Sequence, residues 1–185
     1  DFVNIPTTLL GMVDASIGGK NGVDLDVLKN QIGTFNEPKL LLVDSEYLTT
    51  LSDREMKSGL AEMLKHGLIY DRFYWEQFKS ISEIDYKQFN ELIVRSIEIK
   101  NEIVTQDPTE KGIRKALNFG HTLGHAIESY FMGTNNPLLH GEAIAIGMVL
   151  ESHISKEKGL LTLLEYNEIK TTITGLYNYV KIDDV

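Results

Sequence analysis

The apolar pattern of the chain changes after Thr50, and this change limits the fold most strongly. Before it, apolar residues stand in short runs at 2–5 and 39–44, as expected for strands. After it, residues 52–55 match a Ser-x-x-Glu capping box, and apolar residues recur at helical spacing from residue 60 to residue 68. The sequence therefore predicts a mainly α fold, in which a short β-containing part precedes a multi-helix carboxy-terminal part.

The β-containing part is expected to cover residues 1–50 and the helical part residues 51–185. Gly-Gly and Asn-Gly pairs at 18–22 favour turns, so an irregular hairpin is expected between them and residue 30. After the first helix, five more are expected, at about residues 72–79, 85–105, 112–131, 138–158 and 163–178. The chain opens on a strand that has no earlier partner, so we expect a fragment of a longer protein.

The composition argues against several classes of protein. The 185 residues include 18 basic and 27 acidic ones, and the net charge of −9 opposes binding to nucleic acid. Cysteine is absent, which removes disulfides and thiolate metal sites and fits a reducing compartment. Apolar runs such as 144–150 are far shorter than the roughly 20 residues of a membrane span. We therefore expect a cytoplasmic protein with no membrane partner.

Polar residues at helical spacing follow the expected helix at 112–131. Two of them are histidines one turn apart, an arrangement that can present two imidazole nitrogens to a divalent metal such as zinc. Gly120 and Gly124 leave a patch that another backbone or a ligand can approach. The alternative is a polar stripe that only fixes helix packing and binds no metal. The stripe consists of Arg114, Asn118, His121 and His125.

Other polar residues are ambiguous by themselves. Glu62, Lys65 and His66 share one face of the first long helix, where the simplest interpretation is a surface Glu–Lys pair. Lys100 cannot be distinguished from a solvated lysine.

Two further histidines differ in their surroundings. His140 lies at the expected start of a helix, where the neutral imidazole that binds metal is favoured. By itself, that position fits a ligand and a non-ligand equally well. His153 has charged neighbours on an amphipathic helix and is expected on the surface.

Five segments together resemble the 3-dehydroquinate synthase family, and they extend through nearly the whole chain. They are Ile-Pro-Thr-Thr-Leu-Leu at 5–10, Val-Asp-Ala-Ser-Ile-Gly-Gly-Lys at 13–20, Gly-Leu-Ala-Glu-Met-Leu-Lys at 59–65, Asn-Phe-Gly-His-Thr-Leu-Gly-His-Ala-Ile-Glu at 118–128 and Leu-His-Gly-Glu at 139–142. The resemblance implies an NAD- and zinc-dependent lyase of the shikimate pathway. Such an enzyme converts 3-deoxy-D-arabino-heptulosonate 7-phosphate into 3-dehydroquinate and phosphate. Related sugar phosphate cyclases share much of this pattern.

The resemblance also implies roles for individual residues. Zinc, or another divalent metal such as Co²⁺, would be held by Glu62, His121 and His140, so His125 becomes a substrate-contacting, proton-handling neighbour and not a ligand. The anionic sugar phosphate would be contacted by Lys20, Asn30, Lys65, Lys100, Arg114 and Asn118. The dinucleotide site would be lined by Thr7, Thr8, Asp14, Lys20, Lys29 and Thr50. The family is often dimeric, which implies a homodimer for the full-length protein.

The resemblance marks residues 1–50 as the remnant of an NAD-binding domain. Most of that domain should precede Asp1, and a lysine-containing segment should follow Val185. We therefore expect this polypeptide alone to bind NAD weakly or not at all and to lack activity. Two alternatives stay open: a metal-dependent polyol dehydrogenase of the same superfamily, and a non-catalytic helical domain.

Overall fold

The computed structural model describes residues 1–25, 28–83 and 86–177, with the side chains of 24–31 and 82–86 also outside the description. The chain divides into two compact units, Asp1–Asn118 and Phe119–Val185. Helices dominate both units, which confirms the predicted mainly α fold. A domain boundary near residue 50 stays a prediction.

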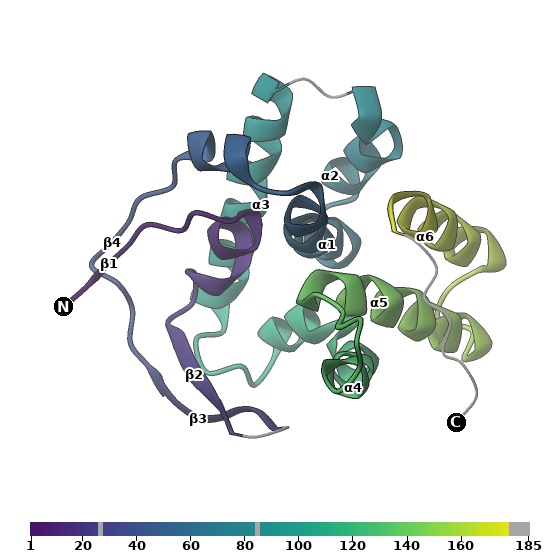
Figure 1. The fold of residues 1–185 in the computed structure, drawn as a ribbon. Helices are drawn as coiled ribbons and strands as arrows, with labels where there is room; N and C mark the ends of the chain where they lie inside the picture. Colours follow the sequence, from purple (N-terminus) through teal and green to yellow (C-terminus); the bar gives the residue numbers. More distant parts are fainter. Residues whose placement is uncertain (26–27, 84–85, 178–185) are drawn as a thin grey trace. The chain divides into compact units, whose positions relative to one another are not determined.

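The β-containing part of the first unit forms two separate strand pairs (Figure 1). Strand β1 (Val3–Asn4) pairs in parallel with β4 (Leu40–Leu41), and β2 (Lys20–Leu25) pairs antiparallel with β3 (Leu28–Phe35). The register of the second pair shifts between Val23 and Leu25, so the expected irregular hairpin is confirmed. The turn into β2 uses two glycines with positive φ, a conformation that other residues rarely adopt.

Helices make up the rest of the first unit. They are η1 (Gly11–Ala15), η2 (Ser45–Thr50), α1 (Asp53–Tyr70), α2 (Arg72–Gln77), η3 (Phe78–Glu83), α3 (Tyr86–Gln106) and η4 (Ile113–Asn118). The predicted start of α1 is confirmed, because the Ser52 side chain accepts a hydrogen bond from the Glu55 amide at 3.3 Å. Residues 58–67 of α1 are all buried, so this helix runs through the core of the unit.

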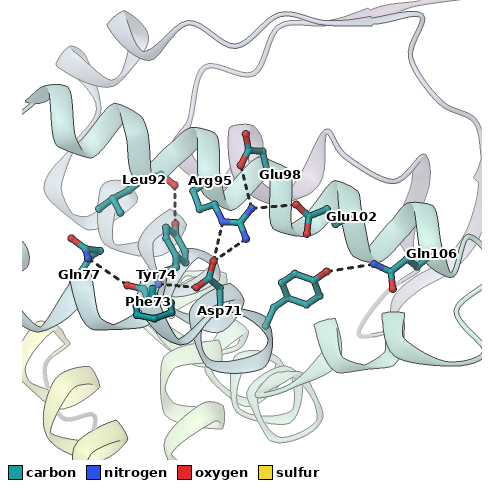
Figure 2. Close-up of polar contacts among 10 residues, drawn as sticks. Asp71, Phe73, Tyr74, Gln77, Leu92, Arg95, Glu98, Glu102 and Gln106 are labelled. Carbon is teal, nitrogen blue, oxygen red and sulfur yellow. Dashed lines mark hydrogen bonds and ion pairs between the residues drawn. The ribbon is translucent and has the colours of Figure 1, made fainter.

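Asp71 connects the end of α1 to α2 and α3 (Figure 2). Its Oδ1 accepts a hydrogen bond from the Tyr74 amide at 3.0 Å and so caps α2. Its Oδ2 accepts from Nη2 and Nε of Arg95 on α3, at 2.8 and 3.0 Å. Arg95 also donates to Glu98 and Glu102, at 3.2 Å each. One carboxylate therefore joins three helices of the unit.

We predict that this junction is sensitive to acid. Burial by itself would raise the pKa of Asp71, but hydrogen bonds from the Tyr74 amide and Arg95 outweigh it and hold that pKa below its ordinary value. Ionised Asp71 therefore stabilises the fold above its unfolded pKa, and this stabilisation is lost as the pH falls through the folded pKa. Asp71→Ala should lower the free energy of unfolding at neutral pH by about 1–2 kcal/mol, because it removes a helix cap.

Urea unfolding at a series of pH values checks this prediction. Asp71→Asn keeps an oxygen that can cap α2 but loses both the charge and the Oδ2 acceptor for Arg95, so it should cost less than Asp71→Ala. Its deficit relative to the wild type should shrink between about pH 5 and pH 2, as the wild-type carboxylate becomes protonated. A deficit that stays constant over this range would contradict the role given to the ion pair.

The second unit contains α4 (His121–Met132), α5 (His140–Glu157) and α6 (Leu163–Leu176). The backbones of α4 and α5 lie very close together. A Cβ atom added at Gly120 would lie 3.0 Å from the Ile144 carbonyl oxygen, and one at Gly124 would lie 3.1 Å from that of Ala143. The predicted close approach at these two glycines is confirmed, and the approaching backbone is that of α5.

The prediction of a single helix at 112–131 is wrong. Its first half is the 3-10 helix η4, and α4 begins separately at His121 after Gly120, which has a φ of +79°. Glu151 supplies hydrogen-bond acceptors for amide groups at the new helix start. Its carboxylate accepts from the Gly120 amide at 2.9 Å and from the Leu123 amide at 3.3 Å. The expected polar stripe is therefore divided. Arg114 and Asn118 belong to the first unit, whereas the histidines belong to the second.

Other expectations for the second unit hold. The capping box at the start of α6 is confirmed: Thr162 Oγ1 accepts from the Glu165 amide at 3.2 Å, and Glu165 accepts from the Thr162 amide at 2.7 Å. The side chain of His153 is 48% exposed, as expected for a surface residue. Among the residues that the structure describes, no helix has the length and apolar character that a bilayer span requires.

Candidate functional site

Three histidines converge in the second unit. His121 and His125 lie one turn apart on α4, and His140 is the first residue of α5. Each ring offers a nitrogen, and these nitrogens lie within 4.8 Å of one another. All three side chains are half-buried, which leaves them accessible to an ion while holding their positions. The cluster has the chemistry of a divalent metal site.

The Nδ1 atoms of two of these rings lie close to oxygen atoms that can accept a hydrogen bond. Nδ1 of His121 lies 3.2 Å from the Phe119 carbonyl oxygen, which can only accept a hydrogen bond. Nδ1 of His140 lies 3.2 Å from Oε2 of Glu128. A neutral imidazole that donates through Nδ1 keeps the lone pair on Nε2, the arrangement typical of metal-bound histidines. The ligand roles of His121 and His140 stay predictions.

In the first unit, Glu62, Lys65 and His66 are all buried within α1, with exposures of 0%, 1% and 0%. The Lys65 ammonium pairs with the Glu62 carboxylate. The interpretation of this group as a surface pair is therefore wrong. Because ions are costly to remove from water, a charged pair in a core indicates a functional site more strongly than a charged pair on the surface does.

Lys100 is also buried and is therefore not a solvated lysine. It reaches from α3 to η1, where its ammonium group donates to the carboxylate and the carbonyl oxygen of Asp14. Burial by itself would raise the pKa of Asp14, but the charges of Lys100 and Lys65 outweigh it and hold that pKa well below its ordinary value. Asp14, Glu62 and His66 each place a ligand atom within 4.8 Å of the others. The ion pairs Asp14–Lys100 and Glu62–Lys65 therefore belong to one buried cluster.

His66 completes this buried cluster as a neutral ring. Its Nδ1 lies 2.8 Å from the Ser96 hydroxyl oxygen. Burial lowers the pKa of His66 well below its ordinary value, and the positive charges of Lys65 and Lys100 lower it further. The sequence placed His66 on the same helix face as Glu62 but indicated no role for it.

A second polar group in the first unit gathers at Glu110. Its carboxylate pairs with the Lys20 ammonium and accepts a hydrogen bond from Asn118 at 2.8 Å. Arg114 is buried and donates to the carbonyl oxygens of Gly18 and Pro108, both at 2.9 Å. The structure thus brings together Lys20 and Asn118, two of the predicted substrate contacts. Sequence reasoning missed Glu110, because an acidic residue in a polar loop has no periodicity to mark it.

Several of the predicted nucleotide-site residues make only local contacts or have side chains outside the described part of the chain. The Thr8 hydroxyl oxygen accepts from the Gly11 amide at 3.1 Å, and the Thr50 hydroxyl donates to the Tyr47 carbonyl oxygen at 3.3 Å, so both make local turns. Thr7 is exposed. The side chains of Lys29 and Asn30 lie outside the described part of the chain, although their backbone belongs to β3. Their roles stay predictions.

Comparison with protein families accounts for nearly the whole chain. The family model described as "3-dehydroquinate synthase N-terminal" matches residues 1–58, and the one described as "3-dehydroquinate synthase C-terminal" matches residues 59–184. The 3-dehydroquinate synthase of Sulfurovum sp. is 43% identical over all of this chain and 53% of its own length. That of Helicobacter pylori is 41% identical over 99% of the chain and 53% of its own length. The chain thus spans about half the length of these relatives.

Solved structures of related cyclases share the fold. ValA, the 2-epi-5-epi-valiolone synthase of Streptomyces hygroscopicus solved with NAD⁺ and Zn²⁺, aligns with a TM-score of 0.81 and 34% identity over 94% of this chain and 49% of its own. A 2-deoxy-scyllo-inosose synthase complexed with carbaglucose-6-phosphate, NAD⁺ and Co²⁺ aligns with a TM-score of 0.85 and 27% identity over 98% of this chain and 51% of its own. With family models that match both parts of the sequence and a relative 43% identical along all of it, the chain belongs to the 3-dehydroquinate synthase family.

Proposed function

We propose that the protein is a 3-dehydroquinate synthase that uses a divalent metal and NAD to convert 3-deoxy-D-arabino-heptulosonate 7-phosphate into 3-dehydroquinate and phosphate. The observation that carries the proposal is the pair His121 and His140, whose Nδ1 atoms each lie 3.2 Å from an oxygen that can accept a hydrogen bond. Family membership then selects the reaction, since a histidine pair by itself fits many metal enzymes.

The proposed metal ligands are His121, His140 and Glu62, with Zn²⁺ or Co²⁺ as the ion. Two imidazoles and a carboxylate are the donor set of many catalytic zinc sites. When bound, such a metal offers open positions to substrate hydroxyls and makes them easier to deprotonate. We assign to His125, which lies one turn from His121 on α4, the role of taking or returning a proton beside the metal.

The substrate carries a carboxylate and a phosphate, so its site needs fixed positive charges. We assign this role to Lys65, Lys100, Arg114 and Lys20, with Asn118 and Asn30 as neutral hydrogen-bonding partners. Support comes from the first unit, where Lys65 and Lys100 are buried within one cluster and Lys20 and Asn118 share Glu110. These contacts hold the cations in place before an anion arrives, which lowers the entropic cost of binding it.

NAD supplies a hydride acceptor when bound and is regenerated within each turnover. Thr7, Thr8, Asp14, Lys20, Lys29 and Thr50 are proposed to line the dinucleotide site. We further propose that the protein acts as a homodimer.

Phosphate release from 3-deoxy-D-arabino-heptulosonate 7-phosphate by the full-length protein, measured with Zn²⁺ and NAD⁺ present, tests the proposal. We expect phosphate without a net change in absorbance at 340 nm, because the hydride taken by NAD⁺ is returned. Net NADH formation without phosphate would indicate a polyol dehydrogenase instead. Because a solved neighbour binds a glucose 6-phosphate analogue, glucose 6-phosphate serves as the competing substrate. Turnover of that sugar alone would place the protein among the other cyclases.

A further inference from the structure

We propose that Glu128 is a positioning residue that holds His140 in the tautomer whose Nε2 lone pair faces the metal. The inference rests on the proposed function, because it concerns the metal ligands named there. Glu128 was part of the motif that suggested the family, but that resemblance assigned it no role.

The position of Glu128 on α4 supports this role. It follows His121 by seven residues and His125 by three, so all three side chains lie on one face of the helix. Glu128 is 5% exposed, and its Oε2 lies 3.2 Å from Nδ1 of His140 on α5. A carboxylate with so little access to water needs a protein donor, and the imidazole of His140 supplies one.

The hydrogen bond has a direct chemical consequence. A neutral imidazole has one N–H group, and without a partner it distributes that proton between its two nitrogens. An acceptor at Nδ1 fixes the proton there and leaves Nε2 as the metal-binding atom. A carboxylate also increases the electron density of the ring, which strengthens the bond from Nε2 to a cation.

The same task is performed differently for the other histidine ligand. Nδ1 of His121 donates to the backbone carbonyl of Phe119, which no side-chain substitution removes. The acceptor for His140 is a side chain and can be replaced. The close backbone contacts between α4 and α5 at Gly120 and Gly124 are independent of Glu128, so its replacement should change the ring of His140 more than the spacing of the helices.

Metal affinity of the Glu128 variants tests the inference, measured by competition with a chelator and by the visible absorption of bound Co²⁺. Glu128→Leu removes the acceptor and should weaken Zn²⁺ binding about 10- to 100-fold, the range typical for loss of a partner behind a metal ligand. Glu128→Gln keeps a neutral acceptor and should weaken it less. Glu157→Gln is the matched control, because Glu157 lies at the exposed end of α5 with a 61% exposed side chain, and it should leave affinity unchanged.

Nitrogen-15 NMR of the metal-free wild-type protein gives a second measurement that needs no variant to fold. We expect His140 to carry its proton on Nδ1. A proton on Nε2, or Zn²⁺ affinity in Glu128→Leu equal to that of the wild type, would overturn the inference. Neither outcome depends on turnover. Normal metal binding through His140 without phosphate release by the full-length protein would instead reject the proposed reaction and leave the role of Glu128 intact.

Discussion

His121→Ala should lose tightly bound zinc. The substitution removes one of the proposed protein ligands, so the affinity should fall by more than the roughly 100-fold upper range that accompanies loss of a partner behind a ligand. Metal analysis after gel filtration in metal-free buffer should find zinc in the wild-type protein and little or none in the variant. In the full-length protein, phosphate release should fall in parallel, because the substrate hydroxyls would lose the cation proposed to make them more acidic.

His153→Ala is the matched control for this experiment. His153 lies on α5 with a 48% exposed side chain, far along the helix from His140, and its removal should leave zinc content unchanged. The comparison separates a specific site from zinc bound loosely by surface histidines. Equal zinc contents in the two variants would remove His121 from the site, and with it the observation on which the proposed function depends.

The helices that begin with strong capping signals could be predicted from the sequence. The starts of α1 and α6 each follow a Ser or Thr whose side chain accepts from the amide three residues later. Such a signal lies within four consecutive residues, so nothing elsewhere in the chain is needed to interpret it. The split between η4 and α4 could not be predicted in this way. The polar spacing on both sides of Gly120 fits one helix, and only the φ of +79° breaks it.

The charged cluster in the first unit shows a different limit. The spacing of Glu62 and Lys65 indicates that they are neighbours, but the same spacing suits a pair on the surface or in a core. What buries them is contributed by distant parts of the chain. Asp14 reaches Lys100 across 86 residues of sequence, and no local pattern predicts that contact. Residue spacing therefore predicted that Glu62 and Lys65 are neighbours, whereas their burial required the tertiary structure.

The glycine contacts between α4 and α5 should maintain the spacing of the proposed histidine ligands. A Cβ atom added at Gly147 would overlap the Gly120 carbonyl oxygen and would lie 2.8 Å from the Gly124 amide nitrogen. Both neighbours are backbone atoms, so the clash can be relieved only if the helices move apart. Gly147→Ala should therefore lower the free energy of unfolding by about 3 kcal/mol, at the upper end of the range for an overpacked core.

Gly175→Ala provides the control, because Gly175 lies in α6 with no atom within 4 Å of an added Cβ. Alanine favours the helix, so this variant should have a free energy of unfolding, measured in urea, that is higher by up to about 1 kcal/mol. Moving α4 away from α5 also separates His121 from His140, so Gly147→Ala should bind Zn²⁺ more weakly even under conditions where it is fully folded. If Gly147→Ala were as stable as Gly175→Ala and bound zinc normally, the spacing of the two histidines could not depend on this contact.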